Sequence, residues 1–198
     1  MVETHERLEK AHEAAHGHGN APDNKRIAVV ITVLAALLAI TETAAKNAQN
    51  AYMSKHIEAA NTWSFYQAKT IRYTQLRSTA EAFEAIGADS FGPAKDKVVA
   101  QVKRWRETGE RYESEPSTGE GRKELMERAR ATELARDRAQ AKLHMFEYGS
   151  AAFQLAIVLA SAAVITGVIA LAFTGIGLGL IGLGFAGLGW FAPTLLHL

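Results

Sequence analysis

Residues 149–198 read GSAAFQLAIVLASAAVITGVIALAFTGIGLGLIGLGFAGLGWFAPTLLHL, and these fifty residues contain no Lys, Arg, Asp or Glu. All 22 basic and all 21 acidic side chains of the 198-residue chain therefore lie before Gly149. A water-soluble domain cannot hide so long an uncharged, mostly apolar stretch from solvent. The stretch instead predicts helices surrounded by membrane lipid.

Two transmembrane helices are predicted in this stretch, over residues 149–174 and 175–198. Small side chains recur along both in alternating steps of four and three, which predicts seams for close helix packing. The seam glycines are Gly167, Gly175, Gly179, Gly182 and Gly189. In water each glycine would cost a helix about 1 kcal/mol relative to Ala, but lipid forces the backbone to bond within a helix. Packing is therefore preferred over a channel-forming or fusogenic role for these glycines.

An earlier apolar run, IAVVITVLAALLAI at residues 27–40, is short for a membrane span and also resembles the core of a signal peptide. The 26-residue leader before it favours a retained transmembrane helix over residues 25–45. Glu42 lies near the end of this span. In an oligomer it would form an acidic ring at a pore mouth that selects cations; otherwise it marks the helix end reaching water.

The intervening residues 46–148 are polar and predict a helical stalk. Residues 43–86 contain no Pro or Gly and predict one long helix, with breaks near residues 87–93 and 114–121. Ser117 and Glu120 are placed to form a capping box for the next helix. The outgoing and return legs have matching lengths, at about 1.5 Å per residue. The fold class predicted is all-α, an integral membrane protein with three transmembrane helices and a long, antiparallel, coiled-coil-like stalk inserted after the first; a compact three-helix bundle is the alternative.

An aromatic stripe occurs on the outgoing helix, in the sequence AANTWSFYQAKTIRYT at residues 59–74. Residues in steps of four and three place Trp63, Tyr66 and Tyr73 on one face, which predicts packing against another helix. The alternative is a strip in which aromatics and Lys69 bind a ligand or a lipid headgroup.

This stretch, with ETHERLEKAHEAAH near the N-terminus and NKRIAVVITVLAALLAI, resembles the bacterial membrane proteins of the domain-of-unknown-function 4337 family. The most specific part of the resemblance is Trp63, Tyr66, Gln67, Ala68 and Lys69. The resemblance implies a charged, His-containing N-terminal tail, one early span, a helical insert and a C-terminal pair of spans in a bacterial inner membrane. It implies no established activity and no catalytic residue.

The sequence HEAAH at residues 12–16 matches the zinc-peptidase pattern H-E-x-x-H, in which two histidines on one helix face bind zinc. The pair lies in the polar tail of residues 1–24, which offers no apolar core and no evident third ligand. His12 and His16 are therefore weak metal candidates, and a zinc peptidase is a remote alternative. The chain has no Cys for disulfides or thiol chemistry, and its net charge of +1 gives no reason to expect nucleic acid as a partner.

Basic residues flanking the spans favour a cytoplasmic stalk, with Lys46, Lys55, Arg136, Arg138 and Lys142 on the stalk side against Lys25 and Arg26 on the other. We expect a non-enzymatic protein of the bacterial inner membrane without cofactors. Its role would be that of a homo-oligomeric scaffold or accessory subunit, associated with lipid and with copies of itself or another membrane complex. An oligomeric pore is the alternative.

Overall fold

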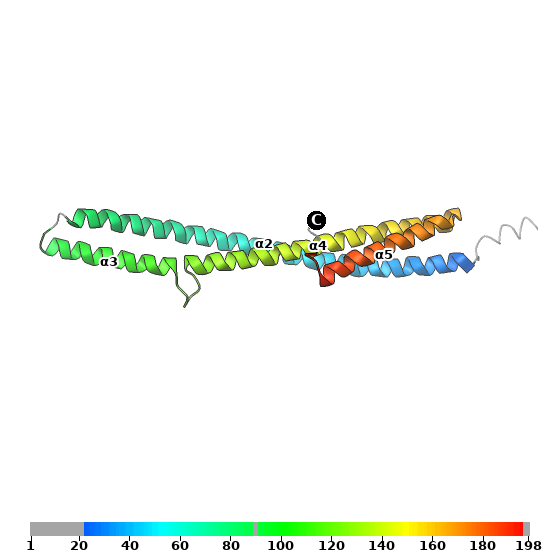
Figure 1. Ribbon diagram of the computed structural model, residues 1–198, viewed down its shortest axis with the longest axis horizontal. Coiled ribbons are helices and arrows are strands. Elements are labelled where there is room, and N and C mark those ends of the chain that lie inside the picture. The colour runs from blue at the N-terminus through cyan, green and yellow to red at the C-terminus, as the bar shows by residue number, and fades with distance from the viewer. Residues whose placement is uncertain (1–21, 89–90, 196–198) are drawn as a thin grey trace, which may run out of the picture. The chain divides into compact units, whose positions relative to one another are not determined.

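The computed structural model describes residues 22–88 and 91–195, and its ordered elements within these ranges are all helices (Figure 1). There are four: α2 (Pro22–Ala88), α3 (Pro93–Glu113), α4 (Arg122–Thr166) and α5 (Ile169–Phe191). The predicted all-α class is confirmed for the described ranges. Most of the N-terminal tail predicted over residues 1–24, including His12 and His16, lies outside them.

The helix boundaries follow from glycine and proline. Helix α2 ends at Ala88, and α3 begins at Pro93, which occupies the first turn, where its missing N–H costs nothing. Gly92 precedes it with a φ of 68°, in the left-handed region. The return leg is broken between Glu113 and Arg122. Each interruption of the polar insert thus lies in a stretch that contains both glycine and proline.

The chain divides into two compact units. The polar unit comprises residues 50–139, and the apolar unit comprises residues 1–49 and 140–198. Helices α2 and α4 each contribute residues to both units. We describe each unit by itself.

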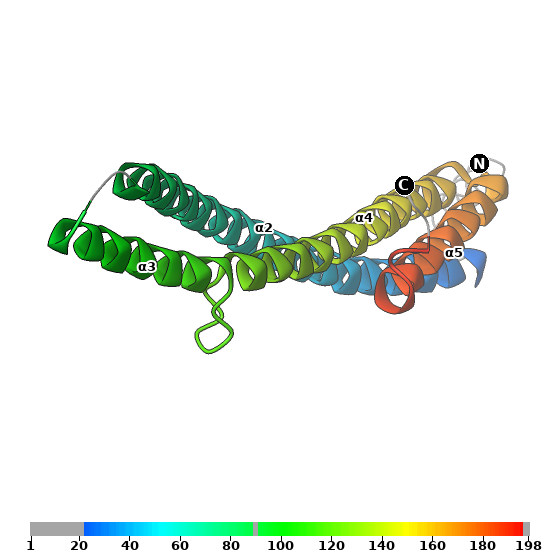
Figure 2. The ribbon, with the colours of Figure 1, turned by 60° about the vertical axis from the view of Figure 1, so that its left-hand side comes forward.

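In the polar unit, α3 and then α4 run along α2 one after the other (Figure 2). The α2–α3 pairing is made by Phe83 and Trp105, whose ring centroids lie 5.0 Å apart in an edge-to-face arrangement, and by Arg106 bonded to Glu84. Ala59 and Ala80 of α2 are almost fully buried against the return leg. Their small side chains let the neighbouring helix approach closely, so this unit is a hairpin with a broken return leg.

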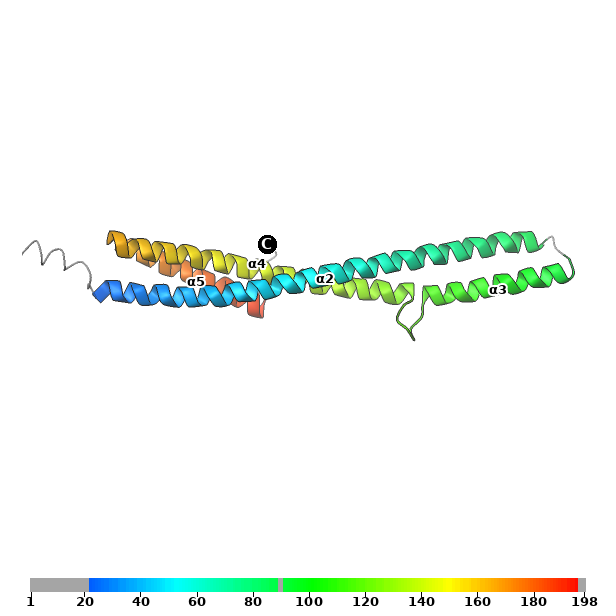
Figure 3. The same cartoon turned by 180° about the vertical axis from the view of Figure 1, so that it is seen from behind.

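In the apolar unit, α5 folds back along the C-terminal part of α4, and the first part of α2 lies beside this pair (Figures 1 and 3). The core contains Leu34 of α2, Phe153 and Ala156 of α4, and Ala186 of α5. Phe153 and Ala156 are fully buried. Three helices are therefore packed around one large ring and several small side chains.

The turn between the last two helices lies at Gly167 and Val168, whereas the sequence placed it between Thr174 and Gly175. Gly167 has a φ of 72°, which residues with a Cβ rarely adopt. Its N–H donates a hydrogen bond of 2.9 Å to the Ala163 carbonyl. The prediction that Gly167 belongs to the packing seam is wrong, since nothing would lie within 4 Å of a Cβ there. In an uncharged stretch either glycine fits a turn; the packing of Gly175 against α4 decides between them.

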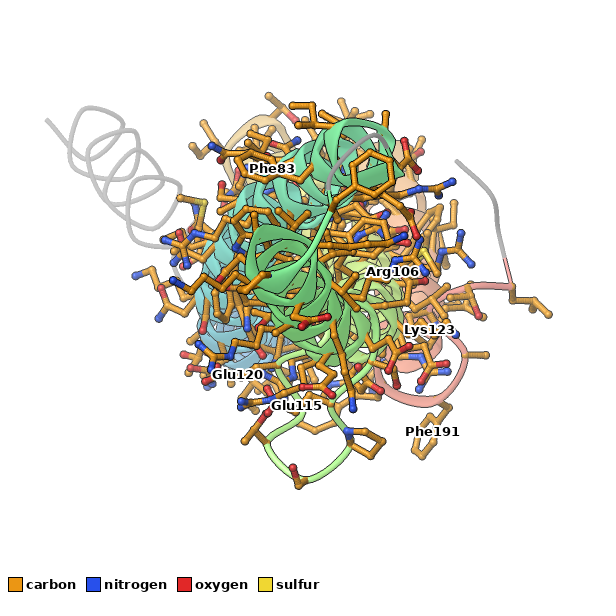
Figure 4. All side chains as sticks on the ribbon, turned by 90° about the vertical axis from the view of Figure 1, so that its left-hand side faces the viewer. Phe83, Arg106, Glu115, Glu120, Lys123 and Phe191 are labelled. Carbon is orange, nitrogen blue, oxygen red and sulfur yellow. The ribbon has the colours of Figure 1, made fainter. Side chains whose placement is uncertain are left out.

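Large apolar side chains cover the outside of the apolar unit. Each of the following is more than half exposed: Val29, Val33, Ile40, Leu155, Val158, Ile165, Ile169, Phe173, Leu180, Ile181, Trp190, Phe191 and Leu195. Phe191 points away from the ribbon (Figure 4). Within the described residues, three helices (α2, α4 and α5) are long and apolar enough to cross a membrane.

Candidate functional site: a cation–aromatic cluster in the polar unit

Lys69 is the most buried cation of the described residues, with 8% of its side chain exposed. Its Nζ lies 5.0 Å from the ring centroid of Tyr112 on α3 and 5.5 Å from that of Phe65 on α2. Its nearest carboxylate oxygen belongs to Glu120, at 3.8 Å. An ammonium group held over two rings gains electrostatic attraction from their faces, which offsets part of its lost hydration.

Arg122, the first residue of α4, is the second cation of the cluster. Its guanidinium carbon lies 4.7 Å from the ring centroid of Tyr73 and 5.7 Å from that of Tyr66. Its Nε donates to the Thr70 hydroxyl at 3.0 Å, and its Nη1 donates to Glu113 at 2.5 Å. The planar guanidinium thus stacks on aromatic rings and donates hydrogen bonds at the same time. It connects α2, the end of α3 and the start of α4.

The loop between α3 and α4 is organised by Glu124. Its carboxylate accepts a hydrogen bond from the Ser114 hydroxyl at 2.6 Å and one from the Glu115 N–H at 3.2 Å. A Cβ at Gly121 would overlap the backbone of Ser114 and Glu115, so only glycine permits this approach. The predicted capping box of Ser117 and Glu120 is wrong, because α4 begins at Arg122 and Glu124 makes the bonds.

Hydrogen bonds set the charge state of two carboxylates at this loop. The Ser114 hydroxyl and then the surrounding N–H groups hold the pKa of Glu124 below its ordinary value of 4.5. The bond from Arg111, foremost among its interactions, lowers the pKa of Glu115 in the same way. Glu115 and Glu120 are seen on this loop in Figure 4. Both pKa shifts favour the ionised carboxylate, and the hydrogen bonds that cause them hold the loop against its helices.

The other site residues predicted on α2 lie on two faces of the helix. The Nε1–H of Trp63 donates to Glu133 of α4 at 3.0 Å, and its ring meets Tyr66 edge to face at 5.4 Å. The structure therefore brings Trp63, Tyr66, Lys69 and Tyr73 together against α3 and α4. Gln67, predicted as part of the same site, is exposed on another face of the helix.

A shallow groove of about 300 Å³ adjoins the cluster between α2 and α3. Its lining includes Tyr73, Trp105, Arg77 and Arg106. Arg77 bonds to Glu81 at 2.9 Å, and Arg106 bonds to Glu84 at 2.5 Å. Because intramolecular carboxylates already neutralise both guanidinium groups, the groove has no strong preference for an anionic ligand. The geometry of the whole cluster is that of helix packing.

The glycine seam lies in the apolar unit. Gly175, Gly179, Gly182 and Gly189 are all buried. A Cβ added to Gly175 would stand 2.9 Å from the Ala156 carbonyl oxygen, one at Gly182 would stand 3.0 Å from that of Gly149, and one at Gly189 would meet the Phe146 ring at 2.7 Å. At Gly179 the neighbour is Leu34 of α2. Gly175 and Gly182 thus allow the backbones of α4 and α5 to approach closely, and Gly179 and Gly189 make room for the side chains of Leu34 and Phe146.

Glu42 lies on the surface of the apolar unit. Its Oε1 accepts a hydrogen bond of 3.3 Å from Nε2 of Gln154 on α4. Glu42 and Gln154 are both exposed, at the end of the apolar stretch of α2.

No metal site is evident among residues 22–88 and 91–195, in which no group of three or more His, Asp and Glu side chains could hold an ion. His12 and His16 fall outside these ranges. Metal binding by the HEAAH pattern therefore stays a prediction.

Sequence reasoning missed three members of the cluster: Tyr112, Arg122 and Glu124. Each lies in or beside the break between α3 and α4. A weak signal for Glu124 exists, since an acidic residue at the third helical position after a glycine is favourable for a helix start. Nothing in the local sequence indicates that Tyr112 and Arg122 meet residues about 50 positions earlier.

Residues 23–192 match the family described as Domain of unknown function (DUF4337). No curated protein and no solved structure matches the chain. The family match spans α2 to α5 and includes both the aromatic cluster and the glycine seam. The chain therefore belongs to the DUF4337 family, as the Trp63–Lys69 stretch indicated.

Proposed function

We propose that this protein is an integral membrane protein of the bacterial inner membrane that acts as a non-enzymatic, self-associating scaffold or accessory subunit. Three transmembrane helices would be formed by residues 25–45 of α2, by the last part of α4 from about Gly149, and by α5. The polar unit would be a helical stalk. The observation that carries this proposal is the inverted surface of the apolar unit, with large apolar side chains outside and small ones inside.

This arrangement is stable in lipid and unfavourable in water. In water, exposed side chains such as Val158, Ile165, Phe173 and Leu180 would form a patch far larger than soluble monomers carry. In lipid they are solvated by acyl chains, and the helices are held together by the close packing of Gly, Ala and Ser residues.

Aromatic rings gather at one end of the apolar unit. Phe146 and Trp190 make a ring contact of 6.0 Å, and Tyr148 and Phe185 make one of 5.7 Å. Tyr148 and Trp190 are both exposed. Such side chains are favoured at the boundary between acyl chains and headgroups. These aromatic residues support a membrane–water interface at this end of the unit, near Glu42 of α2 and Glu147 of α4.

Self-association would use the exposed surface of the polar unit. The buried glycines of the seam offer no surface to further copies, because α4 and α5 bury them against each other and against α2. The stalk of the polar unit instead keeps apolar side chains exposed, among them Met53, Ile57 and Ile71.

Membrane fractionation followed by mass measurement tests the proposal. We expect the full chain to resist alkaline carbonate extraction, to need detergent for solubility, and to run in detergent at a protein mass of more than one copy. Monodisperse protein in plain buffer would contradict the membrane assignment. A strict monomer in several mild detergents would contradict the scaffold role while leaving the membrane assignment intact.

A pore is the second candidate, and the exposed Glu42–Gln154 pair is the observation that favours it. Against it, the hydroxyls of Thr32, Thr166 and Thr174 donate to carbonyls four residues earlier in their own helices, which removes their donors from any channel lining. Planar-bilayer recordings discriminate the two. A pore predicts cation conductance that falls in Glu42→Gln, and a scaffold predicts none above the lipid background.

A further inference from the structure

Helix α2 carries a second face, distinct from the one that packs against α3 and α4. Twelve exposed residues form this face, at positions that recur every seven residues, and we call it the outer stripe. The twelve are Met53, Ser54, Ile57, Ala60, Asn61, Ser64, Gln67, Ala68, Ile71, Thr74, Gln75 and Ser78. None of the twelve is charged. At about 1.5 Å per residue the stripe is about 37 Å long.

The absence of charge is specific to this face. Elsewhere over the same length α2 exposes Glu58, Arg72 and Arg77, and its buried face holds Lys69. A solvated face of a stalk helix is normally rich in Lys and Glu, whereas this one carries Ile57 and Ile71 at 54% and 68% exposure. A continuous uncharged stripe of exposed apolar, small and amide side chains is the pattern of a helix–helix interface.

We propose that the outer stripe is the interface through which two copies of this chain pair, as a parallel two-stranded coiled coil between their α2 helices. Ile57, Ser64, Ile71 and Ser78 would occupy the a positions of the repeat, and Met53, Ala60, Gln67 and Thr74 the d positions. β-Branched residues at a, here Ile57 and Ile71, favour two-stranded pairing. The polar residues at the other core positions make the pairing weaker than that of a fully apolar seam.

A second copy fits the stripe better than an unrelated helix for two reasons. An uncharged face is complementary to itself, because two identical stripes bring no like charges together across a two-fold axis. The stripe and the apolar residues 27–40 also belong to one helix, Pro22–Ala88. Copies inserted in one membrane with the same orientation would therefore present their α2 helices in parallel. This second step rests on the proposed membrane location.

Single-cysteine cross-linking tests the pairing, because the natural chain contains no Cys and each variant carries one thiol. In a parallel pair, each a residue faces its own copy at a distance that a disulfide can bridge. Full-length Ile57→Cys and Ile71→Cys in native membranes are expected to give disulfide-linked dimers on oxidation. The matched controls, Glu58→Cys and Arg72→Cys, are also exposed but lie one residue around the helix. We expect them to cross-link roughly tenfold less.

Each outcome decides the inference. Dimers confined to Ile57→Cys and Ile71→Cys support it. Equal cross-linking at all four positions, or none at Ile57 and Ile71 while a thiol reagent still labels them, overturns it. Fractionation of the same variants separates the two proposals: membrane-bound protein without stripe dimers refutes only the stripe, and soluble protein refutes the membrane location.

A charge-insertion variant gives an independent measurement. The double variant Ile57→Glu/Ile71→Glu places like charges across the axis, so its detergent-solubilised mass is expected to fall by one half. Leu134→Glu, at another exposed apolar position of the polar unit, should keep the wild-type mass. Circular dichroism checks that the helix content is unchanged in both. An unchanged mass in the double variant contradicts the proposal.

Discussion

At the scale of single residues, the glycines of α5 fall into two groups that the sequence alone does not separate. Gly175 faces α4, and a Cβ there would stand 2.9 Å from the Ala156 carbonyl oxygen. Gly177 faces outward, and nothing lies within 4 Å of a Cβ built there. The same residue type is thus required for packing at one position and free to change two residues later.

We predict that Gly175→Ala lowers the stability of the detergent-solubilised protein by about 1–3 kcal/mol, because the backbones must separate. Gly177→Ala is the matched control and is expected to be neutral or to stabilise by up to about 1 kcal/mol through helix propensity. Thermal unfolding of the two variants in one detergent measures the difference. Equal effects at the two positions would contradict the α4–α5 packing.

Arg122 provides a second prediction at this scale. Lysine keeps the charge but loses both the stack on Tyr73 and the Nε bond to Thr70. Arg122→Lys is therefore expected to cost about 1–2 kcal/mol, within the range measured for such contacts. Arg130→Lys, at an exposed position on the same helix, should cost little. Thermal unfolding measures both, and a loss equal to that of the control would show that the charge alone matters.

At the scale of elements, the positions of the breaks decide how the helices pair. The turn between α4 and α5 depends on Gly167, whose φ of 72° costs a residue with a Cβ about 1 kcal/mol or more. Gly167→Ala is predicted to destabilise the apolar unit by that amount, with no steric contribution because the site is open. Calorimetry in detergent measures it. If the turn lay at Gly175 instead, Gly167→Ala would be neutral or stabilising.

The break between α3 and α4 predicts a pH dependence. Because the pKa of Glu124 is lower in the folded chain than its ordinary 4.5, its stabilising effect is complete above that pH and is lost as the pH falls through the folded value. Glu124→Gln should therefore be less stable than wild type near neutral pH, and the gap should narrow as the pH falls below 4.5 and through the lower pKa of the folded chain. Glu127→Gln, exposed on the same helix, serves as control. A gap that does not vary with pH would refute the role given to the carboxylate.

At the scale of the whole molecule, the unequal distribution of charge predicts a membrane orientation. From the basic residues that flank the proposed spans, we predict that the polar unit lies in the cytoplasm. A thiol at Ser117→Cys, on the exposed loop between α3 and α4, should react with a membrane-impermeant reagent only after the inner membrane is opened. Val168→Cys, in the turn between α4 and α5, should react in intact spheroplasts. The reverse pattern would invert the assignment.

How far the sequence predicts this protein differs between its parts. The absence of charge after Glu147 predicted apolar helices at the C-terminal end, and the Pro- and Gly-free run of residues 43–86 predicted one long helix before the first break. The aromatic stripe predicted that Trp63, Tyr66 and Tyr73 share a packed face, and all three are half-buried in the structure. These features depend on local periodicity and composition, which the order of residues contains directly.

Tertiary structure alone decided three matters: that Gly167 is the turn and Gly175 is packed, that Glu124 organises the loop in place of Ser117 and Glu120, and that Arg122 and Tyr112 complete the cluster on α2. Each depends on contacts between residues distant in the chain. The helix propensity is the same for every glycine in an uncharged helix. The sequence around a cation likewise does not indicate which aromatic ring the cation will contact. Only the packing of one helix on another distinguishes them.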